Sequence, residues 1–405
     1  MLTLEGLVRR KEVIICIGSG GVGKTTTSAV LALRAAAMGK KAVVLTIDPA
    51  MRLADSLGLD GLTNQPKRVD PERLSELGVP VTGELSALML NAGQTLEDIV
   101  RQHTTSEEHA QRIFNSAIYK QGIESIIGSP EYMAMEKLYE LYESGKYDLV
   151  VLDTPPAKHA LDFLTAPERM VNFLTDNKLL KVMIRPTIQK DTFGARLVRM
   201  GTAGFMKALN SAFSPEFMEA GAEFFTAMNG LYPGFKSRAE RVYKLFREER
   251  LGFVLVTSPN RLTIDEAVYL HEKLIEFGMP FEGIVVNKVH LDHLKDEDGN
   301  LPAGHEKLAE LVGKKIKPDE LHAALASGLD AQSLWNAALP GLLRNFRNYQ
   351  VLAEIDEKNL ERLRYLLKGD QFMQRVPYLR DDIHDMSGLR QISGHLFDGN
   401  GSAPA

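Results

Sequence analysis

The chain has 405 residues, of which 44% are hydrophobic and 25% are charged. This balance is typical of a soluble globular protein and argues against a disordered, collagen-like or membrane-spanning chain. The formal net charge of −5 gives no sign of a nucleic-acid partner, and we expect none.

The sequence contains one cysteine, Cys16, so an intrachain disulfide and a Cys-x-x-Cys metal site are both excluded. Cys16 lies within the apolar run 13–17, and we interpret it as a buried structural thiol. No apolar run approaches the roughly 18 residues of a membrane span, and the apolar stretch after Arg9, Arg10 and Lys11 is too short for a signal peptide. We therefore expect a cytoplasmic protein.

Short, apolar, β-branched runs alternate with helical stretches along the chain. Continuous apolarity is typical of strands that are buried on both faces of a parallel sheet. The alternation predicts an α/β fold with a doubly wound, mainly parallel sheet. The predicted strands are 13–17, 42–47, 85–90, 148–152, 252–257, 283–286 and, more weakly, 375–379.

Start and stop signals place three helices between these strands. A helix over 25–38 is followed by Gly39 as a C-cap. A second helix begins after Ser129 as N-cap, with Pro130 at its first position, and stops at Gly145. Leucines and aromatic residues recur at helical spacing over 340–368 and predict a third.

We interpret 1–398 as a single P-loop domain with helical insertions that form a helical subdomain. The segment 399–405 is small and polar, and we expect a disordered tail there. The predicted insertions cover about 93–146, 166–249 and 291–371. The predicted sheet core covers about 11–60, 85–92, 147–165, 250–290 and 372–398.

A phosphate-binding motif follows the first strand. Gly18-Ser19-Gly20-Gly21-Val22-Gly23-Lys24-Thr25 matches G-x-x-x-x-G-K-[ST] and opens the predicted helix 25–38. The glycines let backbone N–H groups approach phosphate oxygens, and the helix N-terminus adds positive potential. Lys24 would reach the β- and γ-phosphates, Thr25 would hold Mg²⁺, and Thr26 is placed to reach the α-phosphate. A chance glycine-rich turn is the alternative.

Two acidic residues follow predicted strands. Asp48 comes after 42–47 and Asp153 after 148–152, and parallel sheets bind ligands at the carboxyl ends of their strands. Asp153 fits a carboxylate that binds Mg²⁺ through water, and Asp48 fits the residue that orients the attacking water; both are candidate metal ligands beside Thr25. A turn or helix-capping role is the alternative for each.

These motifs together resemble the family of arsenical-pump and tail-anchored-protein-targeting ATPases, which belongs to the deviant Walker A class. Segments 20–26, 46–56 and 153–161 look like its phosphate loop and its two switches, and Asn287-Lys288 looks like its adenine contact through Asn287. The resemblance spans nearly the whole chain. It implies an ATP-driven, Mg²⁺-dependent homodimer that closes around nucleotide and moves a helical domain.

The chain departs from this family at several positions. The second lysine of the deviant motif, which acts across the dimer, is Ser19 here. We hypothesise that Arg52 or Lys158 supplies the missing charge, although both could simply be solvated switch residues. The clustered cysteines of arsenite-binding members and the Cys-x-x-Cys zinc staple of targeting factors are absent, so we expect neither an arsenite site nor zinc.

Methionine and phenylalanine stripes at helical spacing mark 170–235. They predict either an adaptable apolar groove for a membrane-protein client or membrane partner, or helices that pack on each other. Our leading hypothesis is an Mg-ATPase that couples its cycle to a client or a transport partner. The alternatives are a nucleotide-gated adaptor for apolar helices with little turnover, because Ser19 replaces lysine, and a partition-type positioning ATPase.

Overall fold

The computed structural model describes residues 3–48, 52–76, 82–104, 106–115, 119, 129–156, 162–166, 168–169, 172, 232–292, 331–379, 383 and 385–397. Its strands are β1 (Val13–Gly18), β2 (Lys41–Thr46), β3 (Lys67–Arg68), β4 (Glu84–Met89), β5 (Leu149–Asp153), β6 (Leu251–Thr257), β7 (Phe281–Val289) and β8 (Phe372–Pro377). Its helices are α1 (Leu4–Arg10), α2 (Lys24–Ala37), α3 (Arg52–Ser56), α4 (Pro71–Glu76), α5 (Ala92–His103), α6 (Glu107–Asn115), α8 (Pro130–Glu143), α13 (Tyr232–Leu245), α14 (Arg261–Glu276), α17 (Ala331–Arg364) and α18 (Met386–Phe397).

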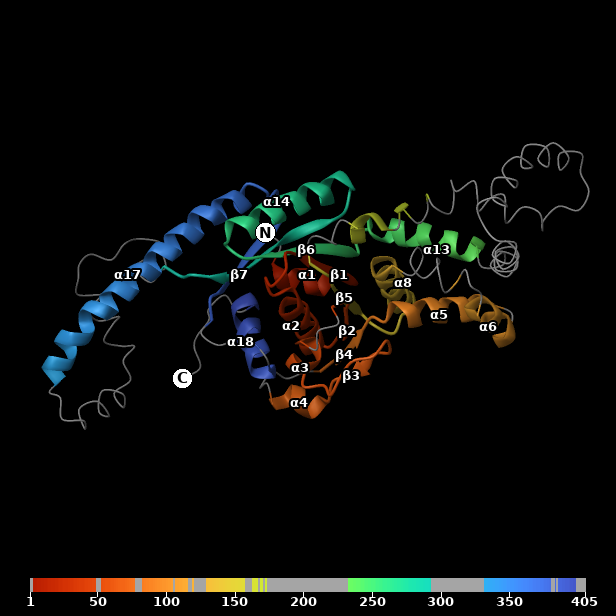
Figure 1. The fold of residues 1–405 in the computed structure, drawn as a ribbon, viewed down its shortest axis with the longest axis horizontal. Helices are drawn as coiled ribbons and strands as arrows, with labels where there is room; N and C mark the ends of the chain where they lie inside the picture. Colours follow the sequence, from red (N-terminus) through yellow and green to blue (C-terminus); the bar gives the residue numbers. More distant parts are fainter. Residues whose placement is uncertain are drawn as a thin grey trace, which may run out of the picture.

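The strands form one sheet in the order β3-β4-β2-β5-β1-β6-β7-β8 (Figure 1). All pairs are parallel except that of β3 with β4. Strand β1 lies between β5 and β6, and the chain leaves it first toward β2 on one side and later returns to β6 on the other. A parallel sheet binds ligands at such a switch point, so the loop after β1 occupies the favoured position.

Helices cover both faces of the sheet, because successive side chains of its central strands point to opposite faces and are apolar on both. Along β1, Ile14 and Cys16 pack with residues of α1, α2 and α18, whereas Ile15 and Ile17 pack with residues of α5, α8, α13 and α14. Every residue of β1 is buried. The sheet is therefore doubly wound, as predicted, with two hydrophobic cores.

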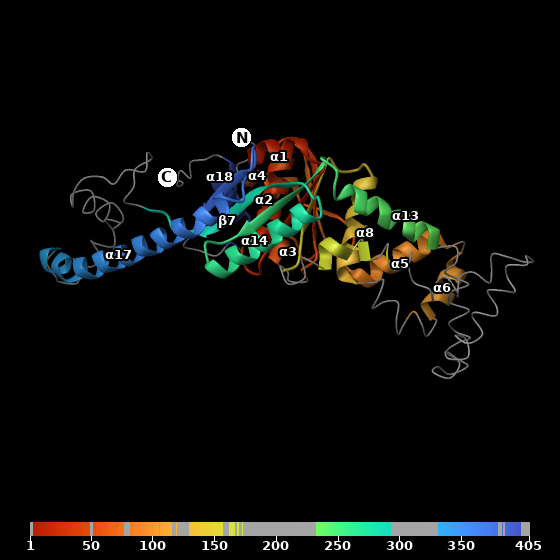
Figure 2. The same ribbon diagram turned by 90° about the horizontal axis from the view of Figure 1, so that it is seen from above.

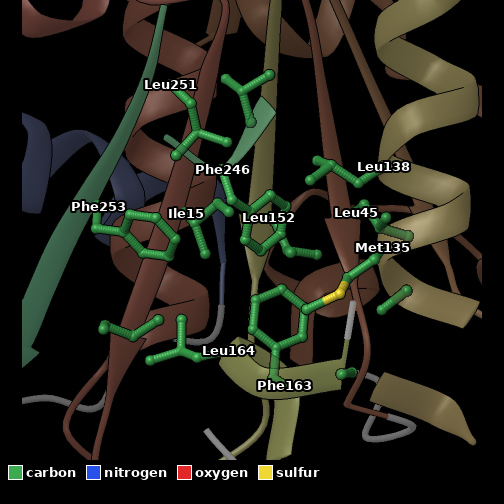
Figure 3. Close-up of a cluster of buried hydrophobic side chains, with 14 of the residues drawn as sticks. Ile15, Leu45, Met135, Leu138, Leu152, Phe163, Leu164, Phe246, Leu251 and Phe253 are labelled. Atoms are coloured by element: carbon green, nitrogen blue, oxygen red, sulfur yellow. The ribbon is translucent and has the colours of Figure 1, made fainter. Parts of the chain in front are cut away.

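The core beneath α8 is rich in aromatic side chains (Figure 3). Phe246 follows α13 and meets Phe163 and Phe253 at ring-centroid distances of 5.8 and 5.9 Å. All three rings are fully buried. This cluster joins the end of α13 to strand β6, so the end of the second predicted insertion is anchored on the sheet.

The seven predicted strands are confirmed, with shifts of a few residues at their ends. Strand β3 was missed, since Lys67 and Arg68 are charged and exposed and give no apolar signal. Helix α17 begins at Ala331, so Pro340 lies inside it, contrary to the predicted range 340–368. Pro340 can be accommodated only with loss of one backbone hydrogen bond.

Helix α17 extends away from the sheet on one side, and α5, α6 and α13 lie on the other (Figures 1 and 2). None of the helices in the described ranges is long and apolar enough to cross a membrane. Of 170–235, where the methionine and phenylalanine stripes occur, only 172 and 232–235 are described. The predicted groove and the tail 399–405 lie outside the described residues.

Candidate functional site

The loop between β1 and α2 lies at the carboxyl edge of the sheet, and its backbone N–H groups precede and open helix α2. Gly23 is the N-cap of α2, with φ of 95°, and no side chain in the described part of the chain caps this helix. By contrast, Asn91, Ser129 and Asn260 cap the first turns of α5, α8 and α14 with side-chain oxygens. The uncapped end of α2 therefore combines available donors with the positive end of the helix dipole, which is the arrangement that binds phosphate.

Lys24 folds back over the loop that precedes it. Its ammonium group donates to the carbonyl oxygens of Gly18 and Ser19, at 3.1 and 2.7 Å. The side chain is buried, and this burial lowers the pKa of Lys24, an effect that nearby Asp153 opposes. Contacts with two carbonyl oxygens thus hold the ammonium group of Lys24 at the phosphate loop. Phosphate oxygens could replace these carbonyl oxygens as its hydrogen-bond acceptors.

Asp153 ends β5 and lies opposite the first turn of α2. The hydroxyl groups of Thr25 and Thr46 both donate to Asp153 Oδ2, at 2.6 and 2.9 Å. Burial raises the pKa of Asp153 to about 6, although both hydroxyl groups and Lys24 favour the charged carboxylate. Asp153 Oδ1 is buried and has no hydrogen-bond partner within the described part of the chain.

Thr46 connects the two acidic residues. It is the last residue of β2 and the register partner of Asp153 on β5. Its hydroxyl oxygen also accepts from the backbone N–H of Asp48, at 3.2 Å. The structure thus brings Asp48 and Asp153 to one corner of the sheet. The sequence placed Thr46 only at the start of the first switch segment and did not reveal its contact with Asp153.

Magnesium suits this group of oxygen donors. Mg²⁺ prefers carboxylate, hydroxyl and water oxygens. The unpartnered, buried Oδ1 of Asp153 and the hydroxyl of Thr25 are such donors, and Asp48 lies half-buried beside them. These residues fit the ion that the phosphate motif implies.

Asn287 near the end of β7 closes the other side of the loop. Its side-chain amide donates to the carbonyl oxygen of Val22 at 3.0 Å. The predicted neighbour Lys288 extends over the same loop, with its ammonium 3.5 Å from the carbonyl oxygen of Gly21. Asn287 therefore contacts the phosphate loop directly, beside which a nucleotide base could lie.

The remaining predicted residues are placed as follows. Ser19 is buried, and its hydroxyl has no partner among the described residues. Gly20 is exposed, and Thr26 is half-buried on α2. Arg52 is exposed at the start of α3, and Lys158 lies outside the described residues.

Cys16 lies behind the phosphate loop within β1 and is fully buried. Burial raises the pKa of its thiol to about 12, so the thiol stays protonated at neutral pH. Metal ligation requires the thiolate. Its position therefore fits the structural role that we predicted.

Residues 11–318 match the family model described as anion-transporting ATPase. ATPase GET3 of Malassezia globosa is 26% identical over 295 residues, which are 71% of this chain and 76% of that protein. ATPase ASNA1 homolog 2 of Paramecium tetraurelia is 29% identical over 279 residues, which are 67% of this chain and 74% of that protein. A putative arsenical pump-driving ATPase of Aquifex aeolicus is 26% identical over 283 residues, 69% of this chain and 81% of that protein.

Proposed function

The chain belongs to the anion-transporting ATPase family and is an ATPase, and we propose that Lys24, Asp48 and Asp153 are the catalytic residues for its hydrolysis of ATP. The observation that carries this assignment is the pair of hydroxyl contacts to Asp153 at the uncapped end of α2. Thr25 and Thr46 hold one carboxylate oxygen and leave the other without a partner among the described residues. A buried carboxylate with one free oxygen beside a phosphate loop suits a metal–nucleotide substrate.

The reaction that we propose is attack of water on the γ-phosphate of ATP. Lys24 would exchange its carbonyl partners for the β- and γ-phosphate oxygens, and the loop N–H groups from 18 to 26 would hold the phosphates. Asp48 would orient the attacking water. Bound Mg²⁺, held through Thr25, Asp48 and Asp153, would neutralise negative charge on the phosphates. Positioning and electrostatic stabilisation account for most of the catalysis in such reactions.

We further propose that the cycle drives a helical subdomain that binds a client or a transport partner, in a protein that resides in the cytoplasm. The name of the Aquifex relative, a pump-driving ATPase, supports a transport partner. Within the chain, the apolar composition of 170–235 supports a client surface. Helix α13 begins at Tyr232, at the end of this segment, and is tied to α8 by the ion pair of Arg238 with the buried Glu136, at 2.7 Å. Helix α8 in turn leads to β5 and Asp153.

The proposed active unit is a homodimer. Ser19 carries no charge, and phosphoryl transfer is accelerated when a further cation contacts the transferring group. Arg52 is exposed four positions after Asp48, and it could act on the partner's nucleotide, as could Lys158. A nucleotide-gated adaptor with little turnover is the second candidate function, because the neutral Ser19 favours it.

Phosphate release per chain, measured across about a hundredfold range of protein concentration, separates these two functions. If a dimer completes the site, specific activity rises with concentration and Arg52→Ala or Lys158→Ala lowers it. Constant activity near that of Lys24→Ala, with nucleotide still bound, would instead favour the adaptor. Unchanged turnover in both the Arg52 and the Lys158 variants would exclude these two residues as the source of charge.

A further inference from the structure

Lys288 has a strained backbone. Its φ of 62° is the one positive value at a non-glycine residue among the described residues. A long side chain in the left-handed region costs free energy, and such residues persist where the surroundings hold them and often where function requires them. The position of Lys288, one residue after Asn287, places this strain at the edge of the phosphate loop.

The contacts on the strand side fix this conformation. The backbone N–H of Lys288 donates to the side-chain oxygen of Asn287 at 2.9 Å. The register between β7 and β8 shifts between Val286 and Val289, so the strand bulges at the two residues that contact the loop. A bulge of this kind redirects side chains away from the regular alternation of a strand.

The chain is fixed again two residues after Lys288, at His290. The backbone N–H of His290 donates to Asp356 Oδ2 at 2.9 Å, and His290 Nδ1 lies 2.8 Å from the same oxygen. The ring of His290 stacks on Tyr378, at 5.3 Å between centroids. Both ends of the bulge are therefore anchored, and the strained conformation of Lys288 is determined by its neighbours.

This arrangement directs two consecutive side chains at two consecutive carbonyl groups of the phosphate loop. Asn287 contacts the carbonyl of Val22, and Lys288 lies 3.5 Å from that of Gly21. Because both contacts use carbonyl oxygens, they leave the N–H groups of the loop available for phosphate. The ammonium of Lys288 stands at the exposed rim of the loop, whereas that of Lys24 is buried within it.

We propose that Lys288 is a further nucleotide-positioning residue. It supplies a positive charge at the rim of the phosphate loop of its own chain, whereas Ser19 within the loop carries no charge. The ligand class is a nucleoside diphosphate or triphosphate, recognised through its phosphate charge. This inference rests on the proposed function, since it requires that the loop bind nucleotide. The strain at Lys288 and its contact with Gly21 are the observations that carry it.

The test compares ADP affinity, measured by calorimetry at low and high salt, among charge and backbone variants of Lys288. Lys288→Met keeps an unbranched stem but removes the charge, and we expect ADP affinity to fall about tenfold at low salt and by less at high salt. Lys288→Arg should restore most of the affinity. Lys288→Gly should lose affinity like the methionine variant yet melt no lower than the wild type, because glycine relieves the strain. The control is Lys273→Met on α14, where Lys273 pairs with Glu276, and it should bind ADP like the wild type.

Unchanged ADP affinity in Lys288→Met would overturn the inference. An equal loss at both salt concentrations, without rescue by arginine, would also overturn it, because a neutral structural brace would then explain the result. Lys24→Ala, measured in the same series, distinguishes this failure from failure of the proposed function. If Lys24→Ala also binds ADP normally, Lys24 does not contact the nucleotide phosphates as the proposed function requires.

Discussion

The side-chain amide of Asn287 occupies the space where a β-carbon of residue 23 would stand. A β-carbon built on Gly23 would lie 2.3 Å from Asn287 Nδ2, and the φ of 95° at this residue is itself unfavourable for an L-amino acid with a side chain. Strand β7 and the phosphate loop are thus fitted to each other at one glycine. The absence of a side chain at position 23 serves both the turn into α2 and the approach of Asn287.

Gly23→Ala should therefore lower the free energy of unfolding by more than the backbone strain alone would. We expect the free energy of unfolding to fall by more than about 2 kcal/mol, together with loss of measurable nucleotide binding. The matched control is Gly278→Ala, where φ is 65° and nothing lies within 4 Å of the added carbon. The difference between the two variants in chemical denaturation measures the destabilisation caused by the clash with Asn287. Adding Asn287→Ala to Gly23→Ala should restore part of the lost stability. Equal destabilisation of the two glycine variants would contradict the predicted clash.

Asp153 should make the nucleotide-free protein less stable as pH rises from about 4 to 6. Burial raises the pKa of its carboxyl from 3.8 to about 6, so between these values the folded state binds more protons than the unfolded state. The shift corresponds to a loss of about 3 kcal/mol across this window, after which stability no longer depends on this group.

Asp153→Asn removes this contribution. We expect the variant to be more stable than the wild type above pH 6 and to have little ATPase activity, because the amide is a poor ligand for the magnesium that the carboxylate would hold. Urea denaturation of both proteins at several pH values, without nucleotide or Mg²⁺, gives the difference directly. If that difference does not change between pH 4 and pH 6, the carboxyl does not titrate as we predict.

Asp48 should affect turnover more than binding. In Asp48→Asn, the neutral amide orients the attacking water less well than the carboxylate, so we expect the rate of hydrolysis to fall about a hundredfold or more. Affinity for ATP should stay within a few-fold of the wild type. Single-turnover hydrolysis and equilibrium binding measure the two effects separately. Loss of binding with an unchanged rate would assign Asp48 to holding the substrate instead.

Removing one partner of the ion pair between α8 and α13 should destabilise the fold. Glu136 is fully buried, accepts from the hydroxyl of Tyr132 at 2.5 Å, and pairs with Arg238. Glu136→Gln leaves the guanidinium of Arg238 without its counter-charge, and we expect a loss of about 3 kcal/mol. Glu143→Gln, which removes a pair with Arg241 between exposed side chains, is the control and should change stability by less than about 1 kcal/mol. Equal effects in chemical denaturation would argue against a special role for the buried pair.

The sequence predicted the corner of the sheet because strand ends were visible as apolar runs followed by Asp48 and Asp153. It did not predict the role of Thr46, since the contact of Thr46 with Asp153 depends on β2 lying beside β5 in one register. Lys288 was noted only within a dipeptide, because a positive φ in a bulged strand leaves no trace in composition or periodicity. Strand β3 was missed because its two residues are charged and exposed, so only its pairing with β4 identifies it as a strand.

The most direct test of the central assignment is release of phosphate from ATP in the presence of Mg²⁺, compared between the wild type and Lys24→Ala at equal protein concentration. Carbonyl groups of the phosphate loop hold the ammonium group of Lys24 where the β- and γ-phosphates would lie. Our account predicts sustained phosphate release by the wild type and at least about a hundredfold less from the variant. Equal rates in the two proteins would show that the hydrolysis does not occur at this loop.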